Sequence, residues 1–305
     1  VNPFAVTIAE EMSGMPGMCI PIRSGGIGFD YRLSMGIPDF WIKLLKDVPD
    51  DRWDMFNLWY ELTTRRPKEK NVGYCESHDQ ALVGDKTLIF RMADAEMYTG
   101  MDKAYHSYTI DRAIALHKMI RFITLTLGSE AYLNFMGNEF GHPEWIDFPR
   151  EGNGWSFKYA RRQWSLADNG YLKYQWLEQF DRAMLKFVRK HRVLNKTDVV
   201  NLWVDQENKL LAYAKGDLIY LFNFNPTYSP TNFFVPAHAT GAGQYRAIFS
   251  TDEVDFGGQD RVSERYVYYT KEVEKRGLGF EVYIPCRTAI VFQRVAEAPA
   301  KESAE

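Results

Sequence analysis

Short apolar segments alternate with helical patterns over the first 196 residues, and this alternation restricts the possible folds more than any other feature. Such an order is typical of parallel strands joined by crossover helices. Because the apolar segments do not alternate with polar residues, the pattern predicts a sheet that is buried on both faces. We predict strands over residues 6–9, 29–33, 72–75 and 131–136, and helices over 38–46, 54–63, 108–127 and 171–188.

The pattern changes after about residue 197, where short strands follow one another with turn residues between them. This spacing is typical of an antiparallel β-sandwich. Residues 296–305 are small and polar, and they predict a disordered tail. We therefore expect an α/β part over residues 1–196, a sandwich over 197–295 and a tail over 296–305. The predicted strands of the sandwich cover residues 210–215, 218–225, 231–235, 245–250, 266–269, 280–284 and 288–292.

Composition excludes several classes of function. The net charge of −3 over 305 residues gives no electrostatic reason to expect nucleic acid or an anionic membrane as partner. No apolar run reaches the ~18 residues of a transmembrane helix. The three cysteines, Cys19, Cys75 and Cys286, have irregular spacing, which argues against a disulfide scaffold or a zinc site and for a reducing, cytoplasmic location. Aromatic residues make up 15% of the chain, and they could form core or stack on sugar rings.

Acidic residues stand where two predicted strands end. Glu10 follows the strand over 6–9, and His78 and Asp79 follow the strand that begins near Val72. The carboxyl ends of the strands carry the active site in parallel α/β barrels. A glutamate partly shielded from water there would have a raised pKa and could hold a proton. Glu11 should point elsewhere, because neighbours on an extended chain alternate. The alternative is that these side chains only cap loops.

A third polar segment follows the strand over residues 131–136. Trp145 could stack on a sugar ring, with Glu144 and Asp147 as partners for hydroxyl groups, or it could simply pack on the sheet. Residues 142–145 (HPEW) of this segment lack metal-ligand spacing at His142, so we expect no metal. Retaining glycoside chemistry needs two carboxyl groups roughly 5–5.5 Å apart. The sequence supplies Glu10 as a candidate acid/base and Asp79 as a candidate assisting carboxylate, but it supplies no residue that we can assign as the nucleophile.

Three segments resemble the α-amylase superfamily in its branching-enzyme form. Residues 9–16 (AEEMSGMP) resemble the general-acid segment, and residues 74–86 (YCESHDQALVGDK) resemble the His-Asp segment of branching enzymes. Residues 135–153 and 159–166 are similar to the region after the eighth barrel strand. The resemblance implies the second half of a (β/α)8 barrel, about strands 5–8, followed by the antiparallel sandwich.

The resemblance also implies roles for residues. Glu10 matches the general acid/base, Asp79 the acid that stabilises the transition state, and His78 the histidine that contacts the sugar. Gln80 and Trp145, together with Asp147, are the expected substrate-binding residues. The Gly-Phe-Arg-Phe-Asp type segment that carries the family's nucleophilic aspartate does not occur in this chain. Cys75 stands where small residues are common, and we expect it to change only packing.

The implied function is glycosyl transfer that cleaves α-1,4-glucan chains and re-forms them as α-1,6 branches in glycogen or starch synthesis. The implied partner is an α-glucan such as amylose, glycogen or starch, with no cofactor. Because the nucleophile is missing, we expect this chain to be inactive alone. We expect the parent enzyme to be a monomer or weak oligomer. The alternatives are an α-amylase-like hydrolase and a non-catalytic glucan-binding fragment.

Overall fold

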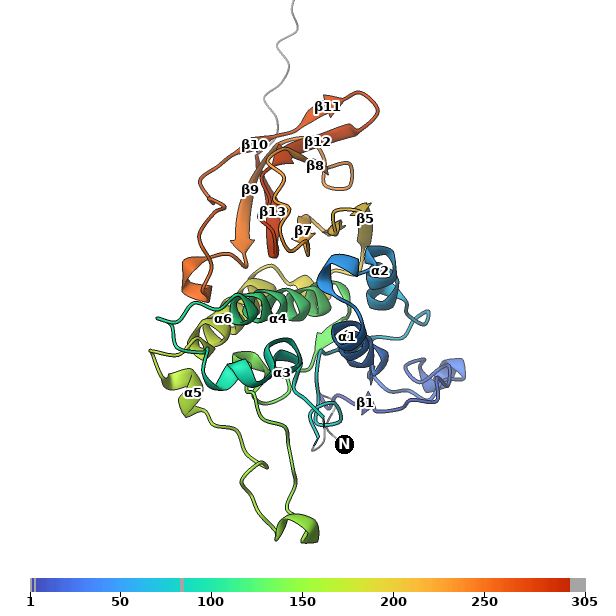
Figure 1. The fold of residues 1–305 in the computed structure, drawn as a ribbon. Coiled ribbons are helices and arrows are strands. Elements are labelled where there is room, and N and C mark those ends of the chain that lie inside the picture. The colour runs from blue at the N-terminus through green and yellow to red at the C-terminus, as the bar shows by residue number, and fades with distance from the viewer. Residues whose placement is uncertain (1, 3, 83–84, 297–305) are drawn as a thin grey trace, which may run out of the picture. The chain divides into compact units, whose positions relative to one another are not determined.

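The computed structural model describes residues 2, 4–82 and 85–296, which form two compact units (Figure 1). Unit 1 comprises Val1–Val48 and Asn57–Asn195, and unit 2 comprises Pro49–Phe56 and Lys196–Glu305. The sequence analysis did not anticipate that Pro49–Phe56 would join the C-terminal unit. The predicted tail lies outside the described residues, apart from Ala296 at the end of the last strand.

The sheet of unit 1 has four strands in the order β1-β2-β3-β4, and every neighbouring pair is parallel. The predicted parallel sheet is therefore confirmed, although each strand is shorter than expected. β3 is buried along its whole length between its two neighbours. The strands are β1 (Ile8–Ala9), β2 (Tyr31–Leu33), β3 (Asn71–Gly73) and β4 (Ala131–Tyr132).

The prediction that the first strand is buried on both faces is wrong. Ala9 is only 3% exposed, but Val6 and Ile8 are 62% and 49% exposed. The reason is the position of β1 at the edge of the sheet, where it pairs with β2 alone among the described strands. Apolar side chains therefore border an open sheet edge.

In the part of the chain that the structure describes, six α-helices connect or follow these strands. The predicted helix over 108–127 is confirmed, and its first turn is capped by the Ser107 hydroxyl, which accepts a hydrogen bond from the Ile110 N–H at 3.2 Å. α3 lies in a segment that was predicted as a loop, although its buried residues Leu88, Ile89, Met92 and Ala93 have helical spacing. The helices are α1 (Gly36–Asp47), α2 (Met55–Thr63), α3 (Leu88–Ala93), α4 (Tyr108–Leu127), α5 (Ser165–Asp168) and α6 (Tyr174–Lys190).

Short 3-10 helices complete the described helical structure. They are η1 (Ile22–Ser24), η2 (Asp50–Arg52), η3 (Asp94–Tyr98), η4 (Asn138–Phe140), η5 (Glu151–Asn153), η6 (Val193–Asn195) and η7 (Val254–Phe256).

Unit 2 contains two antiparallel sheets, as predicted. The larger has the order β10-β9-β13-β7-β6-β5 and the smaller the order β11-β12-β8. Apolar residues of both sheets share one core cluster, which includes Leu221, Val235, Phe280 and Phe292. The strands are β5 (Val199–Asp205), β6 (Leu210–Lys215), β7 (Leu218–Asn223), β8 (Phe233–Pro236), β9 (Gln244–Ser250), β10 (Tyr268–Tyr269), β11 (Lys271–Val273), β12 (Gly277–Val282) and β13 (Thr288–Ala296). β5 and β11 were not predicted.

Polar contacts tie Pro49–Phe56 to the rest of unit 2. The Arg287 guanidinium pairs with the Asp50 carboxylate at 3.0 Å, and both side chains are largely buried. The Gln206 side chain accepts a hydrogen bond from the Met55 N–H at 2.7 Å and donates to the Trp53 carbonyl at 3.2 Å. These partners lie more than 150 residues apart, so no local pattern predicts them.

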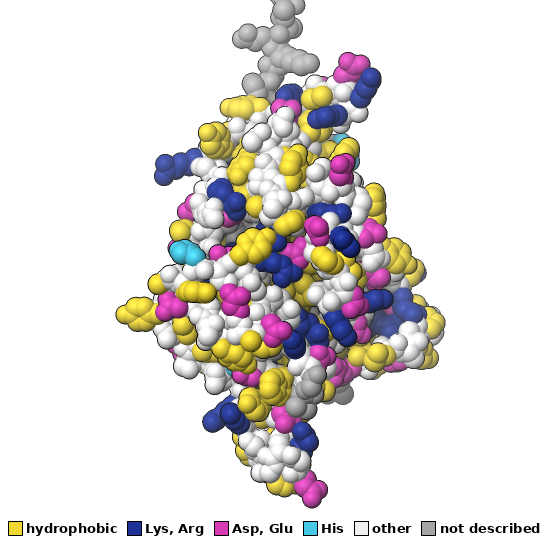
Figure 2. Space-filling model, in the orientation of Figure 1, with side chains coloured by type: hydrophobic (Ala, Val, Ile, Leu, Met, Phe, Trp, Pro, Cys, Tyr) yellow, Lys and Arg dark blue, Asp and Glu magenta, His cyan; other side chains and the backbone are white. Residues whose placement is uncertain are grey.

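Charged groups of both signs are mixed over the face of the molecule shown in Figure 2. This agrees with the small net charge of the chain. Within the described ranges, no helix is long and apolar enough to cross a membrane.

Candidate active site

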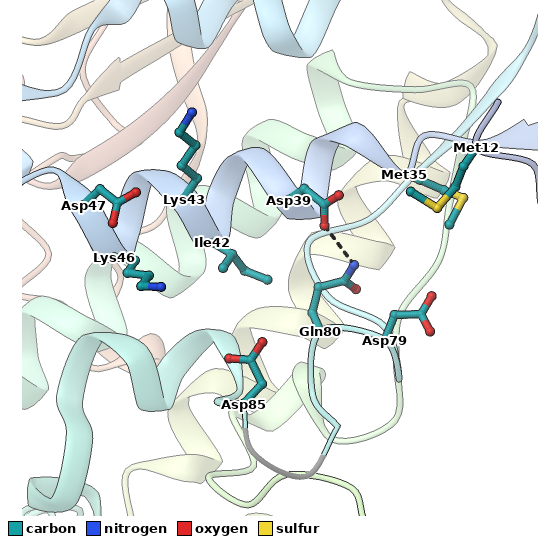
Figure 3. Close-up of a pocket in the computed structure, with 10 residues that line it drawn as sticks. All are labelled: Met12, Met35, Asp39, Ile42, Lys43, Lys46, Asp47, Asp79, Gln80 and Asp85. Carbon is teal, nitrogen blue, oxygen red and sulfur yellow. Dashed lines mark hydrogen bonds between the residues drawn. The ribbon is translucent and has the colours of Figure 1, made fainter. Parts of the chain in front are cut away.

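A cavity of about 560 Å³ lies in unit 1, between α1 and the loop that follows β3 (Figure 3). Figure 3 shows Asp39 of α1 facing Gln80, with Asp79 beside it on the loop. The lining includes acidic, basic and apolar side chains, which suits a polar ligand with apolar faces. They are Met12, Met35, Asp39, Ile42, Lys43, Lys46, Asp47, Asp79, Gln80 and Asp85.

The loop after β3 holds His78 and Asp79 in the open. The His78 Nε2 lies 3.1 Å from the Asp79 Oδ1, and the two side chains are 48% and 42% exposed. The Ser77 hydroxyl supports this turn, because it accepts a hydrogen bond from the Asp79 N–H at 3.2 Å and donates to the Gln80 Oε1 at 2.8 Å. The loop therefore presents both predicted catalytic side chains to solvent, and the hydrogen bonds of Ser77 stabilise its turn.

Gln80 connects this loop to α1. Its side chain is buried, and its Nε2 donates to the Asp39 Oδ1 at 3.3 Å, while its Oε1 is occupied by Ser77. This position fits a residue that orients the Asp79 loop as well as one that contacts substrate.

Tyr74 directly follows β3 and is buried. Burial raises the pKa of the Tyr74 hydroxyl well above its usual value, and the negative charges of Asp79, Asp39 and Glu10 raise this pKa further. Glu10 directly follows β1 and Asp79 lies in the loop after β3, and these strands run parallel in one sheet, so both residues follow the carboxyl ends of their strands. Glu10 is not among the residues that line the cavity around Asp79.

Glu10 itself is exposed, so the shielding expected for its carboxyl group is not provided by the described residues. The edge position of β1 explains this difference. The Glu11 carboxylate accepts a hydrogen bond from the Ser13 N–H at 2.6 Å. Hydrogen bonding by Ser13 lowers the pKa of Glu11, and the Arg32 guanidinium, 3.4 Å away, acts in the same direction.

The segment with Trp145 and Asp147 lies beside the His-Asp loop. The Ile146 N–H donates to the Ala81 carbonyl at 2.6 Å, one residue beyond Gln80. Trp145 stacks on Tyr159 with ring centroids 4.9 Å apart. One face of the indole is thus covered.

The Asp147 carboxylate is already engaged within this segment. It pairs with the Arg150 guanidinium at 3.0 Å, and the hydrogen bond from Arg150 lowers the pKa of Asp147. This arrangement gives Asp147 a structural partner in addition to the substrate contact that the sequence predicts.

The polar face of α1 was not among the predicted site residues. Asp39, Lys43, Lys46 and Asp47 all line the cavity, and their spacing places them on one side of the helix. Only the apolar face of this helix was used in the prediction. The same helical period, applied to its charged residues, would have identified this face.

Glu76 is a second residue that sequence reasoning missed. Its side chain is almost fully buried three residues before Asp79, and its Oε2 accepts a hydrogen bond from the Leu88 N–H at the start of α3. Burial raises the pKa of Glu76 to about 7, although this hydrogen bond and the nearby charges of Arg162, Arg121 and Arg91 act in the opposite direction. Glu76 therefore fastens the His-Asp loop to α3.

In the part of the chain that the structure describes, no group of three or more His, Cys, Asp or Glu residues is arranged to hold a metal ion.

The sequence and fold are similar to those of known carbohydrate-active proteins. The family model for the alpha amylase C-terminal all-beta domain matches residues 203–295. A 1,4-alpha-glucan-branching enzyme of Rhizophagus irregularis is 51% identical over 292 residues, which cover 95% of this chain and 42% of that protein. The branching enzyme of Saccharomyces cerevisiae is 50% identical, covering 94% and 41%, and that of Felis catus is 48% identical, covering 96% and 42%. The chain thus spans about two fifths of the length of these relatives.

Solved structures support the same fold at low sequence identity. An AmyP variant in complex with maltotriose superposes with a TM-score of 0.60 at 10% identity, over 98% of this chain and 57% of that one. A Nostoc punctiforme debranching enzyme gives a TM-score of 0.56 at 16% identity, over 96% and 52%. Over almost its whole length the chain is thus similar to 1,4-alpha-glucan-branching enzymes, and its residues 203–295 match the alpha amylase C-terminal all-beta domain.

Proposed function

We propose that this chain is the part of a branching enzyme that carries the general acid/base and the transition-state stabiliser. The observation that carries the proposal is that Glu10 directly follows β1 and Asp79 lies in the loop after β3, two strands that run parallel in one sheet. Identity near 50% to curated branching enzymes over almost the whole chain supports it.

The sheet of unit 1 fits about strands 5–8 of a (β/α)8 barrel in this proposal. Four parallel strands follow in sequence order, with α1, α2, α3 and α4 between them and α6 after the last. The exposed apolar side chains along β1 are those that a preceding strand and helix would cover. A barrel closed in this way would also supply the shielding of Glu10 that the described residues lack.

The reaction would be a retaining glycosyl transfer. Glu10 protonates the leaving oxygen when the α-1,4 bond breaks, while an aspartate outside this chain forms the glycosyl-enzyme bond. Glu10 then takes the proton from the 6-hydroxyl of an acceptor chain, whose oxygen attacks the glycosyl-enzyme intermediate; the glycosyl-enzyme bond breaks, the aspartate leaves as a carboxylate, and the α-1,6 bond forms. Asp79 stabilises the positive charge of the transition state, and the neighbouring His78 contacts a sugar hydroxyl. Gln80 and Trp145 bind the glucan, with Asp147 as a further polar contact.

The test is to incubate the full-length protein that contains this chain with amylose. New α-1,6 linkages, counted after enzymatic debranching, with nearly constant reducing ends are expected for a branching transferase. Rising reducing ends without branches would indicate a hydrolase and would contradict the proposal. Binding of amylose without either change would favour a non-catalytic glucan-binding role.

A further inference from the structure

Unit 1 contains a second cavity, of about 250 Å³, that shares no lining residue with the cavity around Asp79. Its apolar lining includes Met97, Met101, Leu166 and Leu172. Its polar lining comprises Tyr98, Thr99, Asp102, Glu144, Gln163 and Tyr174. No lysine or arginine is among the lining residues.

Tyr98 gives this cavity an exposed aromatic surface that is held in place. The side chain is 58% exposed, yet its hydroxyl donates to the Glu144 Oε1 at 3.0 Å. Its ring also meets Phe90 edge-on, with centroids 5.8 Å apart. An aromatic ring fixed at its edge and at its hydroxyl loses little freedom when a ligand stacks on it.

The segments that line the cavity are held in place by hydrogen bonds to backbone carbonyl groups. The Lys103 N–H donates to the Tyr171 carbonyl at 2.9 Å, and the Lys173 N–H donates to the Met101 carbonyl at 2.8 Å. On the other side, the Arg162 guanidinium donates to the Glu144 carbonyl at 2.9 Å. The cavity is therefore formed before any ligand binds.

The chemistry of the lining fits a neutral sugar better than an ion. An apolar floor and an exposed ring suit the C–H face of a pyranose, and carboxylate and amide groups suit its hydroxyl groups. The carboxylates of Asp102 and Glu144, without a neighbouring cation in the lining, disfavour phosphate and other anions. The volume lies just below the ~300 Å³ of small ligand pockets, so about one or two sugar units would be enclosed.

We infer that the Tyr98 cavity is a second α-glucan binding site, separate from the site of bond cleavage. The choice of an α-glucan as the sugar rests on the proposed function. A chain held here while another segment occupies the Asp79 cavity would raise the local concentration of substrate without new chemistry.

The test is titration of this 305-residue chain with maltoheptaose, followed by calorimetry. Tyr98→Ala should weaken binding about five- to tenfold, the size of a lost aromatic contact. Tyr60→Ala is the matched control, because Tyr60 is a 60% exposed tyrosine of α2 that does not line the cavity, and binding should not change. Circular dichroism verifies that each variant is folded.

A second variant keeps the inference testable if Tyr98→Ala does not fold. Gln163→Ala removes an exposed rim amide and should weaken binding about two- to fivefold. Unchanged affinity in the folded Tyr98 and Gln163 variants, or an equal loss in Tyr60→Ala, would overturn the inference. Two measurements distinguish the two proposals. If the full-length protein forms branches, but the Tyr98 and Gln163 variants bind maltoheptaose as tightly as the unmodified chain, only this inference fails. If both variants bind maltoheptaose weakly, but the full-length protein forms no branches, only the proposed function fails.

Discussion

At the scale of single residues, Glu10 carries the sharpest prediction. Glu10→Gln in the full-length protein should lower branching turnover by about 10²–10⁴-fold, because the amide cannot donate and accept the proton. Glucan affinity should change little. Glu11→Gln is a matched control, since the Glu11 carboxylate is held by Ser13 and Arg32. Equal turnover in Glu10→Gln and the unmodified protein would remove Glu10 from this role.

Glu76 leads to a prediction about pH. Its pKa of about 7 in the fold exceeds the ordinary value of 4.5, so the folded chain binds this proton more tightly than the unfolded chain. Its contribution to stability is therefore complete below about pH 4.5 and is lost as the pH rises to about 7.

Glu76→Gln should remove this dependence, because the amide oxygen can still accept the Leu88 hydrogen bond but cannot ionise. The free energy of unfolding, measured with urea between pH 4.5 and 8, should fall less steeply with pH in the variant than in the unmodified chain. Parallel curves for the two proteins would contradict the prediction.

At the scale of elements, β1 presents an apolar edge. Ile8→Lys should reduce self-association of this chain, because a charge on an edge strand disfavours edge-to-edge pairing. The free energy of unfolding should change by less than about 0.5 kcal/mol, since Ile8 is half exposed. Sedimentation velocity and urea unfolding measure the two effects.

The neighbouring residue provides the control for this prediction. Ala9→Lys places a charge at a buried position on the same strand, and it should destabilise the chain by clearly more than Ile8→Lys. Equal stability of the two variants would show that the two faces of β1 do not differ as described.

At the scale of the whole molecule, we predict that the 305-residue chain alone forms no α-1,6 branches. The proposed nucleophile lies outside this chain, and without it the covalent step cannot occur. To measure branch formation, the 305-residue chain is incubated with amylose, and the α-1,6 linkages are counted after enzymatic debranching. Branch formation at a rate near that of the full-length protein would contradict it, and would require a nucleophile among the residues present.

Sequence periodicity was sufficient for elements whose residues all take part in one local pattern. The helix over 108–127 and the strand over 210–215 have the predicted bounds, and the parallel and antiparallel sheets follow from the predicted element order. Glu10 directly follows β1, as its motif predicted, whereas His78 and Asp79 lie in the loop that begins after Gly73, the last residue of β3.

The tertiary structure decided what depends on contacts between distant residues. Asp39 reaches Gln80 across 41 positions, and Arg287 reaches Asp50 across 237. The burial of Glu76 and the exposure of β1 likewise depend on which elements pack nearby. A local sequence pattern shows which face of a helix or strand is apolar, but it does not show which other element packs against that face. The sequence by itself therefore determined most of the elements and the candidate chemistry, whereas packing determined the burial of Glu76, the exposure of β1 and the second cavity.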